Sequence, residues 1–498
     1  MHHKNIKLIV RKQLKNKFPN WSRLNRKRKK KLAKEICEAV INGYKFDHEL
    51  DVPVEELIGI EEQMPTDNIM NLDEMTHFLD TFYQNRLFKF SSYKRSYSNI
   101  VEEELKFIDE LLDNQIINLL LSYDGYSPCM REFYPCNFLR AELLKAIKYP
   151  EISYRKFCTE EYLGLDRKQN REFVGLPLNK KLMIDHTQLC QFRASITFSQ
   201  LVNVLVYILH HFYKSGILDN CVLHGIDSTE LANDNRVPLC SIDVNGQKIR
   251  IYNDIDCDCG KRRNKRDKSP YVVGYRMHTL TAINAQTGHS FPLVSLLAPA
   301  NHHDSNFLKP LIKLAQAIGV DVKLITADKA YHDSDASIYE ETGVRLITPP
   351  SSKVLIPENV DPETRAVTLD EICEIPMVLM GREDEGHEFK CGADPGACPR
   401  STTCPQFRIV PFDSGYFQPI PHDIEQADRA IDIRKNSERP FNLLKNQTGL
   451  EDVRVRSQHA LLARSTFSTI ATLLLEMVGT RKKEKTDNQQ MELFDIAA

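Results

Sequence analysis

The chain has 498 residues, of which 42% are hydrophobic and 27% are charged, and this composition is typical of a globular protein with a buried core. The formal net charge of −2 excludes no class of partner, so only the distribution of charge along the chain is informative. The chain has thirteen scattered cysteines, and its basic start is not followed by the apolar segment of a secretory signal. We therefore expect reduced thiols in a cytoplasm and not a secreted protein stabilised by disulfide bonds. The longest apolar stretches, 201–213 and 468–479, are too short or too polar to span a bilayer, so we expect buried helices and no membrane.

Charge is strongly segregated at the start of the chain. Residues 1–34 contain fourteen Lys and Arg and no acid, whereas residues 51–80 contain nine acids and no Lys or Arg. Apolar residues in 101–121 recur at three- and four-residue spacing, which indicates a helix. We therefore predict that residues 1–130 form a basic arm, suited to nucleic acid, and an acidic helical region, which is either a solvated face or an interaction surface.

Residues 131–215 are predicted to form a second helical region, which is our candidate for DNA binding. The pattern then changes to apolar runs that indicate strands within 221–231, 274–288, 290–301, 321–331 and 344–350, with helices at 305–319 and 334–343. The order of three strands, helix, strand, helix and strand predicts an α/β domain with a mixed sheet, whose first part is residues 216–350.

The remainder of the chain divides into three predicted segments. Residues 351–425 are rich in Pro, Gly and Cys and are predicted to be an inserted module. Residues 426–480 are predicted to be helices that complete the α/β domain, and the charged residues 481–498 are predicted to be a disordered tail.

Two predicted strands end in an aspartate, Asp227 in "GIDST" and Asp328 in "ITADKAY". The carboxyl edge of such a sheet is where α/β proteins usually place their sites, although a single aspartate after a strand is more often a turn or N-cap residue. A third acid, Glu438 in "IRKNSERPFNLLKNQTG", lies in a strongly basic segment. Three carboxylates of this kind can hold two Mg²⁺ ions for in-line phosphoryl transfer, and cations alongside them can hold DNA phosphates.

A regular helix would place the third acid and its basic neighbours together. At about 100° per residue, Arg434 and Glu438 are about 40° apart around a helix, and Lys445 is about 20° from Arg434. All three are therefore predicted to share one face. Pro440 lacks a backbone donor, so it is expected either to kink this helix or to mark its first turn.

On these residues the sequence resembles the DDE transposases of bacterial insertion sequences, which have a ribonuclease H-like catalytic domain. Within that family it is similar to the cut-and-paste group with the signature Tyr-x2-Arg-x3-Glu-x6-Lys, which Arg434, Glu438 and Lys445 match in type and spacing. The segments "IDST", "ADKAYHD" and "DHTQLCQFR" also look like motifs of this superfamily, and the resemblance covers about residues 131–475. Ile431 stands at the signature's Tyr position and the inserted module has no Trp, so excision through a DNA hairpin is not expected.

The resemblance implies a fold and an activity. The fold would be a ribonuclease H-like mixed sheet flanked by helices, with the inserted module and the helical N-terminal region attached. Asp227, Asp328 and Glu438 would be catalytic residues that bind two Mg²⁺, with Mn²⁺ able to substitute, and Arg434, Lys445, Arg439 and Lys329 would bind DNA phosphates. The substrate would be double-stranded DNA, both terminal inverted repeats and target, bound by a homodimer in the cytoplasm at the nucleoid. The alternatives are a ribonuclease H-like DNA nuclease that does not transpose, and a non-catalytic DNA-binding protein derived from a transposase.

Three further features of the sequence suggest binding sites. His387, Cys391, Cys398 and Cys404 could form a structural Zn²⁺ site, although reduced cysteines without metal are the alternative and the spacing is unlike short zinc knuckles. The basic loop 261–268 is expected to contact the phosphate backbone. In the tail, Gln490, Met491, Leu493 and Phe494 resemble the pentapeptide that binds the bacterial sliding clamp, and the alternative is that the tail docks on its own core.

Overall fold

The structure is a computed structural model of the 498-residue chain. It describes residues 3–18, 21, 24–43, 68–87, 99–121, 132–233, 237–244, 247–261, 270–284, 286–331, 337–349, 355–362, 364–394, 398–400, 402–411, 424–450, 455 and 457–497. Most of the acidic segment 51–80 and of the basic loop 261–268 lies outside these residues, so the predictions made for them stay predictions.

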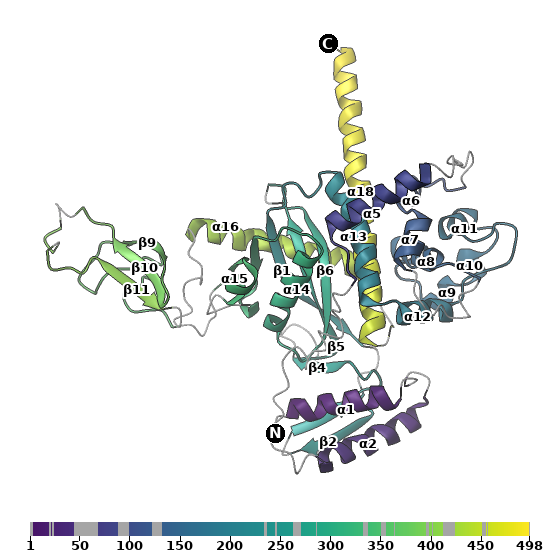
Figure 1. Ribbon diagram of the computed structural model, residues 1–498, viewed down its shortest axis with the longest axis horizontal. Helices are drawn as coiled ribbons and strands as arrows, with labels where there is room; N and C mark the ends of the chain where they lie inside the picture. The colour runs from purple at the N-terminus through teal and green to yellow at the C-terminus, as the bar shows by residue number, and fades with distance from the viewer. Residues whose placement is uncertain are drawn as a thin grey trace.

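A mixed sheet occupies the centre of the molecule (Figure 1). Its strands are β1 (Leu223–Ala232), β4 (Asp258–Lys261), β5 (Tyr271–Ile283), β6 (Ser290–Pro299), β7 (Leu324–Ala327) and β8 (Arg345–Ile347). Strands β1, β5 and β6 are an antiparallel series, and β7 and β8 continue the sheet parallel to β1 on its other side. The predicted order of strands and helices is confirmed, and the topology is compatible with a ribonuclease H-like fold.

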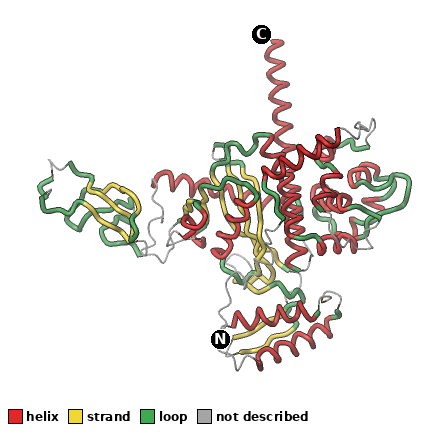
Figure 2. The backbone as a smooth tube through the Cα atoms, in the orientation of Figure 1, coloured by secondary structure: helices red, strands yellow, loops and turns green. Residues whose placement is uncertain are grey.

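Helices pack against this sheet (Figure 2). They are η3 (Asp304–Phe307), α14 (Leu308–Ala317), η4 (Lys329–Tyr331), α15 (Ser337–Thr342), α16 (Ile424–Arg434), η6 (Lys435–Ser437), α17 (Glu438–Asn442), η7 (Leu443–Gln447) and α18 (Gln458–Ala497). Helices α14 and α18 pack on β6, while α16 packs on β7 and β8. A small apolar cluster joins Ala427 and Ala430 of α16 to Leu223 and Ile347 of the sheet.

The helical region before the sheet shares the sheet's main core. Its helices are α5 (Leu72–Leu87), α6 (Glu103–Leu111), α7 (Asn114–Leu120), α8 (Pro135–Lys148), α9 (Tyr154–Phe157), α10 (Glu160–Leu163), α11 (Lys168–Val174), α12 (His186–Ser195) and α13 (Phe198–Lys214). Helix α13 is apolar on most of its surface and is therefore buried. Arg193 of α12 forms a buried ion pair with Glu142 of α8, so part of this region's positive charge is used inside the protein.

Helix α18 is the central helix of that core. Its first part, Gln458–Gly479, is long and apolar enough to cross a membrane, but 83% of its most apolar window is buried among the described residues. That burial is expected for the core helix of a globular domain. The backbone of 481–497 continues α18 as a helix, which differs from the predicted disordered tail. The side chains of the predicted clamp-binding residues, Gln490, Met491, Leu493 and Phe494, lie outside the described part of the chain.

The N-terminal helices form a separate small module with an insertion in the sheet domain, a pairing that the sequence did not indicate. Helices α1 (His3–Lys17) and α2 (Arg26–Gly43) cover the hairpin of β2 (Cys240–Val244) and β3 (Gln247–Ile251), at the bottom of Figure 1. They share an apolar core that contains Val10, Cys37 and Ile249. Helices α1 and α2 are therefore part of a folded unit and do not form a free basic arm.

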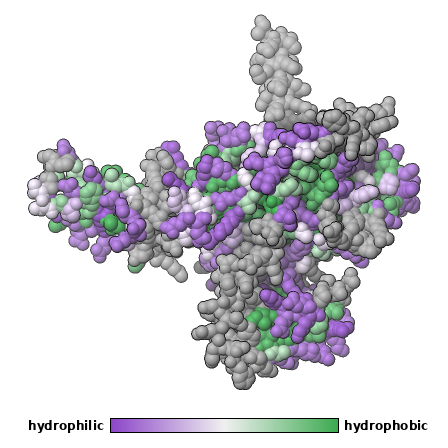
Figure 3. Space-filling model, in the orientation of Figure 1, coloured by the Kyte–Doolittle hydropathy of each residue, from purple (hydrophilic) through white to green (hydrophobic). Residues whose placement is uncertain are grey.

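The inserted module projects at the left of Figure 1, on the side of the sheet domain away from the helical region, and contains β9 (Met377–Arg382), β10 (Gly386–Cys391) and β11 (Phe407–Pro411). Apolar side chains are visible on its surface (Figure 3), and Val378 and Met380 are among the exposed ones. The inner side has its own small core around Val367, Phe389 and Val410.

The structure does not support the predicted zinc site in this module. Among the described residues, no group of three or more His, Cys, Asp or Glu side chains could hold a metal ion. His387 is buried in β10, Cys391 lies at the end of that strand, and the loop residues Cys398 and Cys404 are held by backbone bonds to Asp394 and Arg400. The twelve cysteines that the structure describes are free thiols.

Candidate active site

Two predicted catalytic aspartates lie side by side at one edge of the sheet. Strands β1 and β7 are parallel neighbours, and their register pairs Ile226 with Ala327. Asp227 and Asp328 each follow the paired residue of their own strand. Because neighbouring strands are about 4.8 Å apart, the backbones that carry these carboxylates are in close proximity.

Tertiary packing brings Glu438 to the same place. Leu223, Gly225 and Asp227 share one face of β1, because side chains alternate along a strand. Ser437 packs on that face so closely that a Cβ on Gly225 would lie 2.8 Å from the Cβ of Ser437. The hydroxyl of Ser290 on β6 donates to the carbonyl of Asn436 over 2.7 Å and fixes the same turn. Glu438 follows directly as the first residue of α17, beside Asp227.

The electrostatics of Asp227 show that the three acids interact. Burial raises the pKa of Asp227 to about 6, while the backbone N–H of Ser228 and the charge of Arg434 oppose the rise. The charges of Glu438 and Asp328 raise the pKa further. The charges of Glu438 and Asp328 therefore oppose ionisation of Asp227, and a bound cation would relieve that repulsion.

This raised pKa predicts a pH-dependent effect of Asp227→Asn. The folded chain holds the proton up to about pH 6, whereas the ordinary value is 3.8, so the ionised side chain destabilises the folded state increasingly as pH rises between these values. We expect Asp227→Asn to raise the free energy of unfolding by on the order of 1–3 kcal/mol at about pH 7.5 and by roughly a third of that at about pH 4.5.

Denaturant unfolding in EDTA at the two pH values measures this difference, with Asp166→Asn as a control at an exposed aspartate. A stabilisation of equal size at both pH values would contradict the electrostatic explanation.

The predicted phosphate-binding cations divide into two groups. Arg434 is half-buried at the end of α16, close enough to Asp227 to lower its pKa, and Lys329 is exposed directly after Asp328. Arg439 points elsewhere: it contacts Nδ1 of His289 at 3.1 Å and Glu476 of α18 at 3.4 Å. Arg439, His289 and Glu476 line an open cavity of about 570 Å³ on the α18 side, so the partly exposed Arg439 is engaged with α18 and not with the carboxylates.

The prediction that Arg434, Glu438 and Lys445 share one helix face assumed a single regular α-helix, and this assumption is wrong. The segment changes from α16 to the 3-10 turn η6, then to α17 and to the π-helical turn η7, which contains Lys445. A constant 100° per residue does not apply across these changes of helix type. Pro440 is in the first turn of α17, where its missing N–H is tolerated.

Beneath the carboxylates lies a buried polar layer that the sequence did not identify. The hydroxyl of Tyr331 is 2.9 Å from Nδ1 of His278, whose ring stacks on Phe307 with centroids 4.2 Å apart. Burial raises the pKa of Tyr331 and lowers that of His278 to about 3, so both side chains are neutral at physiological pH. Tyr331 follows Asp328 by three residues, and its closeness to a predicted catalytic acid was the only feature of the sequence that could have pointed to this buried layer.

The donor chemistry of this edge fits a hard divalent cation. Carboxylate oxygens are the ligands that Mg²⁺ prefers, and the repulsion among Asp227, Asp328 and Glu438 favours cation binding. The side chains of the described residues are nevertheless not preassembled into a metal-binding group. The three acids share an edge, and metal binding would require their side chains to turn toward one another.

Ile431, which stands in place of the signature Tyr, packs with the apolar cluster between α16 and the sheet. It is half-buried and contributes to the contact of α16 with β1 and β7. This position has a packing role here, and an aliphatic side chain cannot stack on a nucleotide base as an aromatic ring does.

No family model matches this chain, and no curated protein matches it. Among solved structures, it is similar to the piggyBac transposase in a cryo-EM synaptic complex with hairpin DNA. The identity is 11%, the TM-score is 0.24, and the similarity covers 76% of this chain and 80% of that chain. A similarity of this size does not by itself indicate a shared fold or function.

Proposed function

We propose that this chain is a DNA transposase of the DDE type, which cuts the ends of an insertion sequence and joins them to target DNA in a metal-dependent reaction. The observation that supports the proposal is the meeting of three acids from distant parts of the chain, Asp227, Asp328 and Glu438, at the carboxyl edge of a mixed sheet. A protein that only binds DNA has no need of a repulsive cluster of acids at such an edge.

In this proposal the three carboxylates hold two Mg²⁺ ions, for which Mn²⁺ can substitute. When bound, two such ions activate the attacking oxygen and stabilise the leaving 3′ oxygen in an in-line displacement. Arg434 lowers the pKa of Asp227 and so helps to keep it ionised. Lys329 and Lys445 supply cations for the phosphates near the scissile bond, while Arg439, held by His289 and Glu476, supports the turn that carries Glu438.

The partners follow from the same chemistry. Pairing two element ends requires at least a homodimer on double-stranded DNA, and the tail motif would recruit a sliding clamp. Because Ile431 packs in the protein, we propose an excision route that does not depend on an aromatic grip at that position.

The test uses purified chain, a plasmid that carries the DNA flanking this gene, and Mg²⁺ or Mn²⁺. We expect metal-dependent cuts at the element ends and joining of a labelled end to target DNA, both absent in Asp328→Asn. Cutting without joining would identify a ribonuclease H-like nuclease instead. Binding without cutting, unchanged in Asp328→Asn, would identify a non-catalytic DNA-binding protein.

A further inference from the structure

The outer face of α2 carries a stripe of lysines. Lys27, Lys30, Lys31 and Lys34 follow the spacing i, i+3, i+4 and i+7, so they lie within an arc of about 100° around the helix and extend about 10 Å along it. All four are exposed, whereas Ala33 and Cys37 on the other side are buried in the module's core. We call Lys27, Lys30, Lys31 and Lys34 the lysine stripe.

Folding of the helix does not explain the lysine stripe. Like charges at four-residue spacing repel one another, and cations in the first turn oppose the helix dipole, where α2 has no acid. Two of the lysines approach acids on the same helix, Lys31 to Glu35 at 3.7 Å and Lys34 to Glu38 at 3.6 Å. These pairs are solvent-exposed and therefore weak, so the lysines can exchange them for phosphates.

Lys29 of α2 has a structural role in this module, in contrast to the lysine stripe. Lys29 is buried, donates to the side-chain oxygen of Asn253 over 3.1 Å and lies over the ring of Trp21. Trp21 in turn donates to the carbonyl of Asn253. Lys29 thus anchors α2 to the segment between β3 and β4, and the lysine stripe points away from that anchor.

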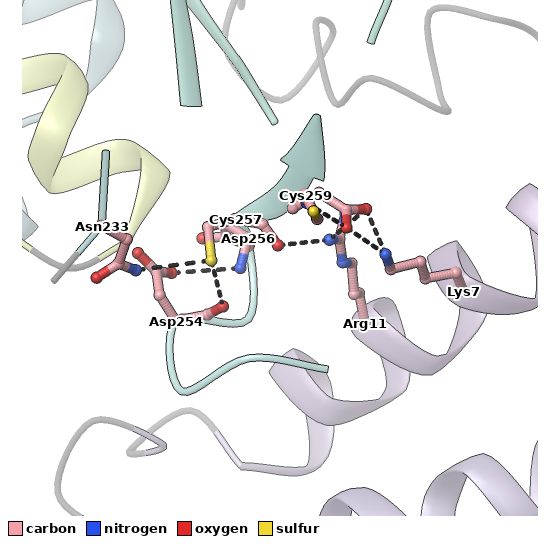
Figure 4. A network of polar contacts seen from close by, with 8 residues as sticks. Lys7, Arg11, Asn233, Asp254, Asp256, Cys257 and Cys259 are labelled. Carbon is pink, nitrogen blue, oxygen red and sulfur yellow. Dashed lines mark hydrogen bonds and ion pairs between the residues drawn. The ribbon is translucent and has the colours of Figure 1, made fainter. Parts of the chain in front are cut away.

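The module is fixed to the sheet at the end where the carboxylates lie. Lys7 and Arg11 of α1 form ion pairs with Asp258 at the start of β4 (Figure 4). Asp258 and Ala232 both pair with Gly274 of β5, one on each side. Ala232 is five residues beyond Asp227 on β1, which corresponds to roughly 17 Å along the strand. The ion pairs therefore hold the module beyond the carboxyl end of β1.

We propose that the lysine stripe binds the phosphate backbone of double-stranded DNA, independently of base sequence, next to the edge where the carboxylates act. The identity of the ligand rests on the proposed function, because a polyanion that must reach this edge is the substrate DNA. Lysine contacts of this kind position DNA and supply affinity but carry no sequence choice. The same module would therefore serve both the element ends and the target DNA.

The test measures the affinity of the full chain for a short DNA duplex by fluorescence anisotropy in EDTA, between about 50 and 200 mM salt. We expect the variant with Lys27, Lys30, Lys31 and Lys34 changed to Gln to bind about 10- to 100-fold more weakly at the lower salt. The slope of log affinity against log salt should fall by about 3–4, since each lost phosphate contact contributes about 0.9.

The matched control changes four exposed cations outside the module, Lys106, Lys323, Arg345 and Lys390, to Gln, which removes the same formal charge. We expect its slope to stay near that of the unmodified chain. Equal slopes for the two variants, or equal affinity of the stripe variant and the unmodified chain, would overturn the proposal.

Because binding is measured without metal, this test is separable from the test of catalysis. Asp328→Asn should bind with an unchanged slope although it cannot cut. If the unmodified chain binds with the expected slope but does not cut DNA, the lysine stripe stands as a DNA contact and the transposase proposal fails. If the unmodified chain cuts DNA but the stripe variant binds DNA as tightly as the unmodified chain, the lysine-stripe proposal fails and the transposase proposal stands. Thermal unfolding of both variants confirms that each is folded.

Discussion

Replacing Glu438 by glutamine is expected to lower the rate of metal-dependent DNA cutting by about 10²–10³-fold or more, while DNA binding and folding are retained. Glutamine keeps the size and one oxygen of the side chain but removes its charge. The acid lies near Asp227, and its charge helps to raise the pKa of that side chain, so the two carboxylates interact at the same edge of the sheet. Loss of one negative ligand weakens binding of divalent cations where the phosphodiester reacts.

The control for this variant is Glu103→Gln. Glu103, like Glu438, is exposed and is the first residue of a helix, so both variants lose one exposed carboxylate at the start of a helix. We expect Glu103→Gln to cut DNA at the unmodified rate. Rates are measured with saturating DNA over a series of Mn²⁺ concentrations. Similar rates for Glu438→Gln and Glu103→Gln at every concentration would remove Glu438 from the active site.

Replacing Gly225 by alanine is expected to have the second large effect. The new Cβ would lie 2.8 Å from the Cβ of Ser437 and 3.0 Å from Cδ1 of Ile283, so the turn before Glu438 must move away from β1. Overpacking of this kind lowers the free energy of unfolding by about 1–3 kcal/mol. A displacement of this turn moves Glu438 relative to Asp227, and a misplacement of about 1 Å can lower a rate by 10²-fold.

Two further variants make this prediction specific. A Cβ added to Gly381, in β9 of the inserted module, would meet none of the described atoms within 4 Å, so Gly381→Ala controls for the general effect of alanine in a strand. Adding Ser437→Gly to Gly225→Ala removes the atom that clashes most closely and should recover much of the cutting rate and of the melting temperature. If Gly225→Ala behaves like Gly381→Ala, close packing of this turn on β1 does not position the acid.

Much of the site was predictable because strand ends carry a simple signal. The apolar run that stops at Asp328 places this acid directly after β7. Strand β1 continues past Asp227 to Ala232, so Asp227 lies within a strand, and its pairing with β7 brings it to the same edge. The neighbours of Arg439 were not predictable, because His289 and Glu476 come from a turn and a helix that only tertiary packing brings together. His387 and the three cysteines lie near one another in the chain, but the structure does not bring them together into a metal-binding group among the described residues.

The sequence by itself determined the order of strands and helices and the positions of the acids along the chain, because hydrophobic periodicity and strand ends are local properties. Only the tertiary structure decided that Ser437 packs on Gly225 and so places Glu438 beside Asp227, and that α1 and α2 complete a module with the hairpin of β2 and β3. Both decisions depend on contacts between residues about two hundred positions apart. Such contacts are set by shape complementarity and ion pairs across the fold, which leave no periodic trace in the chain.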